Sequence, residues 1–305
     1  MTFLNGRVEV HGHRGARGLR PENTLPGFAH ALALGVDAVE LDVGLTADGV
    51  VVVHHDQALS PVTTTDTVPV TPGDPLFPYV GRDLRDLTLA QVRTVDAGVR
   101  RLRPGQDDDP FVLTQLPLPG TRPPTLAEVC GLLRVAGDVL PAVELKTDPG
   151  WPDDEITRFV AAVAEVLDTH GLTASARLLA FDWRVLTEAR RLVPEAARVA
   201  LVERTTLDPA WLAGLSPDDV TAAAVALDAG VLSPERHLVT PDLVRDAHGL
   251  GLPVTVWTVN VASEMARLIE YGVDAIVTDY PDRLRIVLAS YGLPLPEPCT
   301  TVPLH

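Results

Sequence analysis

Short apolar runs alternate with longer segments of helical periodicity along most of the chain. The first helical segment has apolar residues spaced by three and four positions, with Asn23 as its expected capping residue and Gly35 as its end. Strands are predicted at 7–12, 37–43, 140–146, 176–181, 197–202, 222–227, 253–259 and 274–279. Further helices are predicted at 125–137, 153–169, 183–193, 207–214, 240–249, 262–271 and 281–290.

Eight strands that are each followed by a helix are typical of a (β/α)₈ barrel, the TIM barrel. The alternative is a doubly wound sheet, but the glycine-rich stretch "HGHRG" (11–15) lacks the third glycine of a dinucleotide-binding turn. We therefore expect an α/β protein with one barrel as its catalytic domain, over residues 1–290.

One apolar run, "VVVHHD" (51–56), does not fit the eight-strand count. It follows Asp48-Gly49, a strong hairpin signal, so we expect 50–55 to fold back antiparallel beside the second strand. Residues 57–123 are rich in Pro, Thr, Asp and Gly and have one helical segment at 88–98. We interpret them as a small cap-like insertion on the loop side of the barrel, and 291–305 as a C-terminal tail.

The net charge of −16 limits the kind of molecule that the protein can be expected to bind. A chain of 305 residues with this acidic balance is not expected to bind nucleic acid, and an anionic substrate has to be held by local cations. The two cysteines lack metal-binding or disulfide-framework spacing, and no signal peptide or membrane-spanning run is visible. We expect a cytoplasmic location without stable membrane anchoring.

Carboxylates recur at a two-residue spacing in two of the predicted strands. Glu40 and Asp42 in "VELDV" share one strand face, and Glu144 shares a face with Lys146 in "AVELK". Three inward carboxylates from two strands suit a hard divalent cation. The competing interpretation is a set of salt bridges inside the barrel, with Lys146 and Arg14 as the cations.

Two histidines are expected at the same rim. His13 ends the first strand and His55 ends the hairpin strand, and histidine titrates where it can act as both acid and base at neutral pH. Arg14 and Lys146 would donate to phosphate oxygens. His11 and His54 are expected to be structural.

The ordered motifs "HRGARGLRPENTLPGF", "GVDAVELDVGLTADGVVVVHHD", "AVELK", "LPVTVWTVN" and "GVDAIVTDYPD" resemble those of glycerophosphodiester phosphodiesterases, from about residue 8 to 288. The resemblance implies a somewhat distorted barrel that cleaves small-molecule glycerophosphodiesters to sn-glycerol 3-phosphate and an alcohol, with Ca²⁺ or Mg²⁺. It implies that Glu40, Asp42 and Glu144 bind the metal. His13 and His55 would be the acid and base, with either water or an adjacent substrate hydroxyl as the nucleophile.

The same resemblance implies three supporting residues. Trp257 would pack against the glycerol group, although a tryptophan in an apolar strand is also compatible with plain core packing. Asn260 and Glu22 would support the site, and Glu22 is equally compatible with a favourable helix-terminal charge. The alternative function is a barrel phospholipase of C or D type that acts on phospholipids or lysophospholipids, and a non-catalytic barrel is the alternative outside enzymes.

Overall fold

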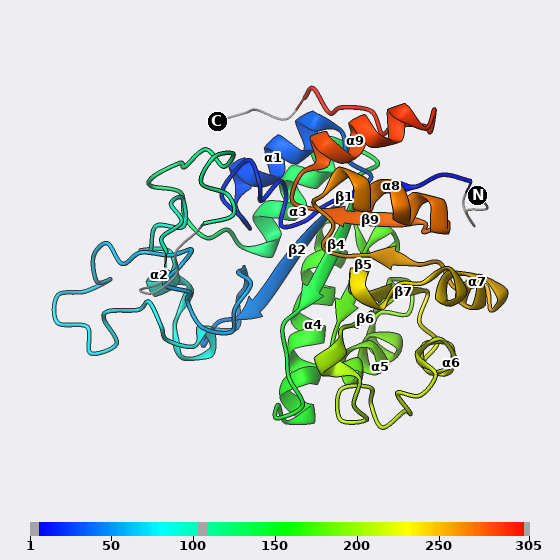
Figure 1. Ribbon diagram of the computed structural model, residues 1–305. Helices are drawn as coiled ribbons and strands as arrows, with labels where there is room; N and C mark the ends of the chain where they lie inside the picture. Colours follow the sequence, from blue (N-terminus) through cyan, green and yellow to red (C-terminus); the bar gives the residue numbers. More distant parts are fainter. Residues whose placement is uncertain (1–5, 103–108, 302–305) are drawn as a thin grey trace.

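The strands close into a barrel. In a computed structural model that describes residues 6–102 and 109–301, eight parallel strands follow one another around a ring (Figure 1). Isolated parallel bridges, Leu232 to Val254 and Glu235 to Trp257, close the ring between its sixth and seventh strands in chain order. The strands are β1 (Glu9–Gly12), β2 (Ala38–Leu45), β4 (Leu140–Leu145), β5 (Arg177–Ala180), β6 (Ala197–Val202), β7 (Val231–Pro234), β8 (Thr255–Val256) and β9 (Ala275–Thr278).

Each barrel strand is followed by a helix, which confirms the predicted (β/α)₈ fold. These helices are α1 (Leu25–Leu34), α3 (Leu126–Ala136), α4 (Asp153–Thr169), α5 (Trp183–Leu192), α6 (Val220–Ala226), α7 (Pro241–Gly249), α8 (Ala262–Tyr271) and α9 (Pro281–Ser290). Within the described residues, no helix is both long and apolar enough to cross a bilayer.

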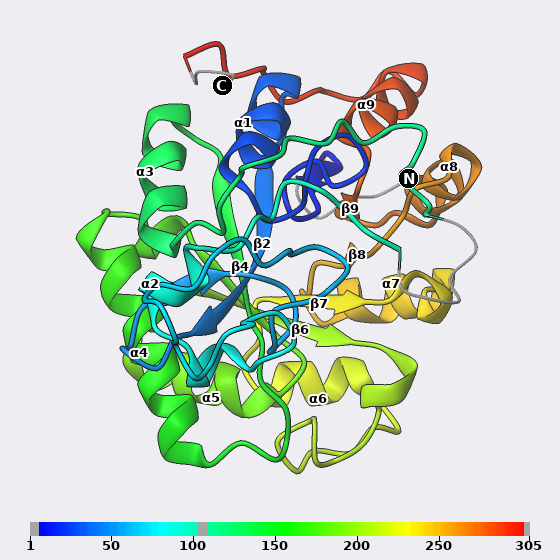
Figure 2. The same cartoon turned by 90° about the vertical axis from the view of Figure 1, so that its left-hand side faces the viewer.

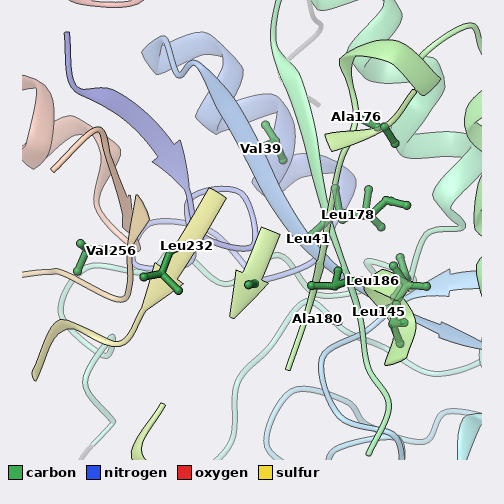
Figure 3. Packing of buried hydrophobic residues seen from close by; sticks show 14 of the residues in the cluster. Val39, Leu41, Leu145, Ala176, Leu178, Ala180, Leu186, Leu232 and Val256 are labelled. Atoms are coloured by element: carbon green, nitrogen blue, oxygen red, sulfur yellow. The ribbon is translucent and has the colours of Figure 1, made fainter. Parts of the chain in front are cut away.

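The two faces of each strand serve different purposes. Val39, Leu41 and Val43 of β2 point outward and are fully buried in the large apolar cluster between strands and helices. Figure 3 shows two of them, Val39 and Leu41, within that cluster. The alternate residues Glu40 and Asp42 therefore point into the barrel, as the strand period requires.

The sequence prediction was wrong at two neighbouring segments. Residues 222–227, predicted as a strand, lie in and just after α6, and the barrel strand that they were meant to supply is β7. An alanine-rich run has high helix propensity, and the Asp219 side chain accepts a hydrogen bond from Ala222 N at the start of the helix. The helix predicted at 207–214 is a series of turns, in which Ala213 and Gly214 both have positive φ.

Helix α1 begins one residue later than expected. Its N-cap is Thr24, whose side chain accepts a hydrogen bond from Gly27 N, while Gly35 closes the helix as predicted. Asn23 has a left-handed backbone with φ of 55° and directs its side chain to the barrel interior. The capping residue and the site residue are thus adjacent but distinct.

The expected hairpin is present: β3 (Val51–Val53) pairs antiparallel with β2. The described parts of the segment 57–123 that follows contain the short helix α2 (Leu89–Val92) and project from one side of the barrel, toward which β2 runs (Figures 1 and 2). It carries a separate apolar cluster around Tyr79, to which Val52 of β3 also belongs. The segment is therefore anchored to the hairpin by its own small core.

A partly buried polar cluster lies at the amino-terminal ends of the strands, away from the hairpin. Arg177 donates two hydrogen bonds to the carboxylate of Glu9, at 2.7 and 3.1 Å, and Nε2 of His11 is 2.9 Å from the same carboxylate. His11 thus has ionic partners of its own at the opposite end of the strand from His13.

Candidate active site

The turn after β1 is held in an unusual backbone conformation. Arg14 and Gly15 both have positive φ, at 50° and 87°, and a Cβ atom on Gly12 would lie 2.3 Å from the carbonyl oxygen of Gly15. Only glycine fits such a close approach. The turn directs the Arg14 backbone N–H to Glu40 Oε2, at 2.9 Å, and places His13 beside the same glutamate.

His13 is oriented by a carboxylate from the far end of the sequence. Its Nδ1 lies 2.6 Å from Oδ1 of Asp279, the residue that follows β9. The side chain of Asn260 donates to Oδ2 of Asp279 at 2.6 Å, and its Oδ1 accepts from the Asp279 backbone N–H. Because an ionised carboxylate only accepts hydrogen bonds, Nδ1 of His13 carries the proton. Nε2 is left facing Glu40, 3.9 Å from Oε2.

His55 has a similar partner. Its Nδ1 lies 2.6 Å from Oδ1 of Asp56, and about a third of its side chain is exposed. His54, by contrast, is buried and uses Nε2 to contact Ala58 O and Ser60 N in the chain that leads into the insertion. Of the two adjacent histidines, His55 therefore belongs to the site and His54 to the loop that leads into the insertion.

Burial governs the charge state of the two site histidines. Desolvation lowers the pKa of His13, and the nearby Asp279 carboxylate only partly opposes this. Desolvation also lowers the pKa of His55, against the opposing field of Asp42. Burial would raise the pKa of Asp279, but the field and hydrogen bond of His13 outweigh it and hold that pKa at about 2. Two neutral imidazoles are therefore expected at neutral pH, each beside an ionised aspartate.

The three inward carboxylates form one cluster. One oxygen from each of Glu40, Asp42 and Glu144 lies within 4.8 Å of the others, and all three side chains are buried. Asp42 and Glu144 are direct partners in the β2–β4 register. Oδ2 of Asp42 accepts from the Asn23 side chain at 2.8 Å, whereas its buried Oδ1 accepts no hydrogen bond from any described residue.

The pKa values of this cluster record mutual repulsion. Burial and the charges of Asp42 and Glu144 raise the pKa of Glu40. Burial also raises the pKa of Glu144. The pKa of Asp42 is lowered, because Arg14, His55 and Lys146 together outweigh its burial. A cation among these oxygens would relieve the repulsion, and the orphaned oxygen of Asp42 is a suitable ligand, so the residues fit a divalent metal ion.

Two cations flank the cluster. Nε of Arg14 lies 3.1 Å from Asp42, and Nζ of Lys146 lies 2.5 Å from Glu144 and 3.4 Å from Asp42. Glu22 is buried behind Arg14 and accepts a 2.6 Å hydrogen bond from its guanidinium. The salt-bridge interpretation therefore describes real contacts, but these contacts leave Oδ1 of Asp42 without a hydrogen bond.

A cavity of about 240 Å³ opens beside these groups. Seven of the residues predicted from the sequence line it: His13, Arg14, Glu40, His55, Glu144, Lys146 and Trp257. The other three predicted residues, Asp42, Glu22 and Asn260, contact residues of the site. Its far wall is apolar, with the Phe181 ring 5.4 Å from the Trp257 ring in an edge-to-face contact. The Trp257 indole N–H donates a hydrogen bond to Ser233 O at 2.9 Å, which fixes the orientation of the indole ring.

Sequence reasoning missed Asp56 and Asp279, the partners of the two histidines. Both stand directly after strand-like segments, in "HHD" and "VTD", where a carboxylate at the carboxyl end of a barrel strand was the available signal. No role was assigned from the sequence to Arg17, which also lines the cavity.

The chain resembles known proteins over nearly its whole length. The model of the glycerophosphoryl diester phosphodiesterase family matches residues 13–283. A glycerophosphodiester phosphodiesterase of Caldanaerobacter subterraneus is 28% identical over 279 residues, which cover 90% of this chain and 95% of the relative.

Solved structures agree with this relationship. A putative glycerophosphoryl diester phosphodiesterase from Silicibacter pomeroyi is 34% identical, with a TM-score of 0.83 over 94% of this chain and 95% of the other. A phosphodiesterase of Oleispira antarctica, solved in complex with the product sn-glycerol-3-phosphate, is 26% identical, with a TM-score of 0.71 over 93% and 97% of the two chains. The present chain is accordingly an enzyme that belongs to the glycerophosphoryl diester phosphodiesterase family.

Proposed function

We propose that this enzyme hydrolyses glycerophosphodiesters to sn-glycerol 3-phosphate and an alcohol, using one Ca²⁺ or Mg²⁺ and the two histidines. The observation that carries the proposal is the meeting of three buried carboxylates and two aspartate-paired histidines at one cavity. The Oleispira antarctica relative, solved with sn-glycerol-3-phosphate, supports the same product.

Glu40, Asp42 and Glu144 would hold the ion. Oxygen-only ligands favour Ca²⁺ or Mg²⁺ over softer metals. When bound, the ion supplies Lewis-acid polarisation of a phosphoryl oxygen. Arg14 and Lys146 present N–H donors beside the same carboxylates and would bind the remaining phosphate oxygens.

The two imidazoles divide the proton transfers between them. The neutral ring takes a proton at Nε2 from the nucleophile as the new P–O bond forms. The other ring must first be protonated at Nε2, and it then gives that proton to the leaving alkoxide as its bond to phosphorus breaks. Asp279 and Asp56 hold Nδ1 protonated on each ring, so that Nε2 is the nitrogen that exchanges protons. Trp257 and Phe181 would pack against the glycerol carbons.

Phosphodiesterase activity of the purified enzyme should depend on a divalent ion. We expect EDTA to abolish release of glycerol 3-phosphate from glycerophosphocholine, and added Ca²⁺ or Mg²⁺ to restore it. Asp42→Asn should weaken the restoration, whereas Glu195→Gln, an exposed carboxylate far along the sequence, should not. Full activity in chelator after exhaustive dialysis would contradict the metal dependence.

The histidine pairs make a second prediction. His13→Ala and His55→Ala should each lower kcat by about 10²- to 10⁴-fold without lowering the melting temperature substantially. Asp279→Asn should lower kcat by at least about tenfold, because the amide stabilises an imidazolium less well and no longer fixes the tautomer. The exposed His237 serves as the control, and His237→Ala should be as active as the wild type. Turnover within a few-fold of wild type in either His→Ala variant would remove that ring from the mechanism.

A second candidate, hydrolysis of lysophospholipids, is favoured by one observation. Val112 and Leu113 are 71% and 93% exposed. They follow the buried Phe111, whose ring contacts the cavity residue Arg17, and exposed apolar residues of this kind can enter a lipid surface. We expect Leu113→Ser to leave the rate on soluble glycerophosphocholine unchanged, and the enzyme to prefer that substrate to micellar lysophosphatidylcholine. A preference for the micelles that is lost in Leu113→Ser would replace the main proposal by this one.

A further inference from the structure

One cation of the cavity has no task in the mechanism. Arg17 lines the cavity with His13 and His55, and its side chain is 21% exposed. Nε lies 3.1 Å from Glu22, but the guanidinium donates no hydrogen bond to any residue in the described part of the chain. Arg14 and Lys146, by comparison, each hydrogen-bond a carboxylate directly. Arg17 is therefore the cavity cation with the most donors left for a ligand.

Contacts with the insertion hold Arg17 in place. Its guanidinium carbon lies 4.8 Å from the centre of the Phe111 ring, a cation–π contact. The Gln115 side chain donates to Arg17 O at 2.6 Å, and Leu116 N donates to Leu19 O at 3.0 Å. An arginine fixed in this way loses little conformational entropy when it binds an anion.

Arg17 shares its ion-pair partner with two other arginines. Arg14, Arg17 and Arg100 all contact one carboxylate, Glu22, and their fields, against its burial, hold its pKa at about 2. Arg14 also lies 3.1 Å from Asp42, and Arg100 lies 3.4 Å from Asp109, whereas Arg17 forms an ion pair with no carboxylate other than Glu22 among the described residues. Glu22 therefore offsets the charge of Arg17 only in part, because it is shared with two other guanidinium groups.

The shape of the cavity indicates which part of the substrate meets Arg17. At the deep wall Leu179, Leu201 and Val277 are 3–6% exposed, so this end is apolar and closed. Glycerol is the constant part of these substrates and suits a closed end, whereas the alcohol varies in size and needs the open rim. The rim is where Arg17 and His55 remain partly exposed.

We propose that Arg17 is a specificity-determining residue that binds the head group and favours anionic over cationic alcohols. The inference rests on the proposed glycerophosphodiester substrate and adds the class of head group. A carboxylate or phosphate on the alcohol would pair with the free donors of Arg17, whereas a choline ammonium would be repelled by it.

The test compares three synthetic esters of sn-glycerol 3-phosphate: those of 3-hydroxypropanoate, propan-1-ol and choline. All three release the same glycerol 3-phosphate, so one coupled assay reads them all. We expect kcat/KM of the wild type to be about tenfold higher for the anionic ester than for the choline ester, and the ratio to fall as salt is added. The propanol ester should lie between them.

Variants identify the residue responsible. Arg17→Gln should bring the ratio of the two charged esters close to one, Arg17→Glu should invert it, and Arg17→Lys should retain most of it. Arg20→Gln is the matched control, because Arg20 belongs to the same turn but donates to Leu19 O and does not line the cavity, so it should keep the wild-type ratio.

The outcomes separate this inference from the proposed function. A wild-type ratio near or below one, or an unchanged ratio in Arg17→Gln, would overturn the role of Arg17 while leaving the hydrolysis intact. Release of glycerol 3-phosphate from none of the three esters would overturn the proposed function, and the head-group assignment with it. If Arg17→Gln fails to fold, the wild-type ratio and its salt dependence still decide the matter.

Discussion

Repulsion among three buried carboxylates is the interaction around which this site is organised. Glu40, Asp42 and Glu144 come from two adjacent strands and point into the same part of the barrel. Ionised carboxylates so close together, out of water, need positive charge or hydrogen-bond donors nearby. Arg14, Lys146 and the Asn23 amide supply part of this, and the Oδ1 atom of Asp42 stays without a hydrogen bond. The remaining deficit of positive charge is the reason why we propose that the cluster binds a metal ion.

The turn after β1 is shaped by this requirement. Arg14 and Asn23 both have left-handed backbones, which non-glycine residues seldom adopt, and both direct side chains to Asp42. Backbone strain of this kind persists where surrounding contacts compensate for it. Here the compensation comes from the contacts of the turn with the carboxylate cluster and with Glu22. The opening motif of the sequence is therefore one structural unit with the acidic strands.

The parts of the fold that depend on local periodicity could be predicted from the sequence. The two-residue spacing of Glu40 and Asp42 gives their shared face directly, and the repeat of the pattern at Glu144 identifies the adjacent strand. The hairpin at Asp48-Gly49 is equally local. These features need no knowledge of distant contacts, and the structure has all of them.

Other features depend on contacts that sequence separation conceals. Asp279 lies 266 residues from His13, and nothing local distinguishes it from a solvated loop aspartate. The alanine-rich run at α6 is apolar enough for a strand or a helix, and the cap at Asp219 decides in favour of the helix. Nothing near Arg17 in the sequence indicates its place at the cavity, because Gln115 of the insertion, which contacts it, comes about a hundred residues later.

The most direct test of the account is a calorimetric titration of the metal-free protein with Ca²⁺ and with Mg²⁺. The account predicts one ion bound per chain, with binding lost or strongly weakened in Asp42→Asn, the variant that changes the orphaned ligand. Absence of binding by either ion, or equal binding by the wild type and Asp42→Asn, would contradict the claim that these three carboxylates form one metal site.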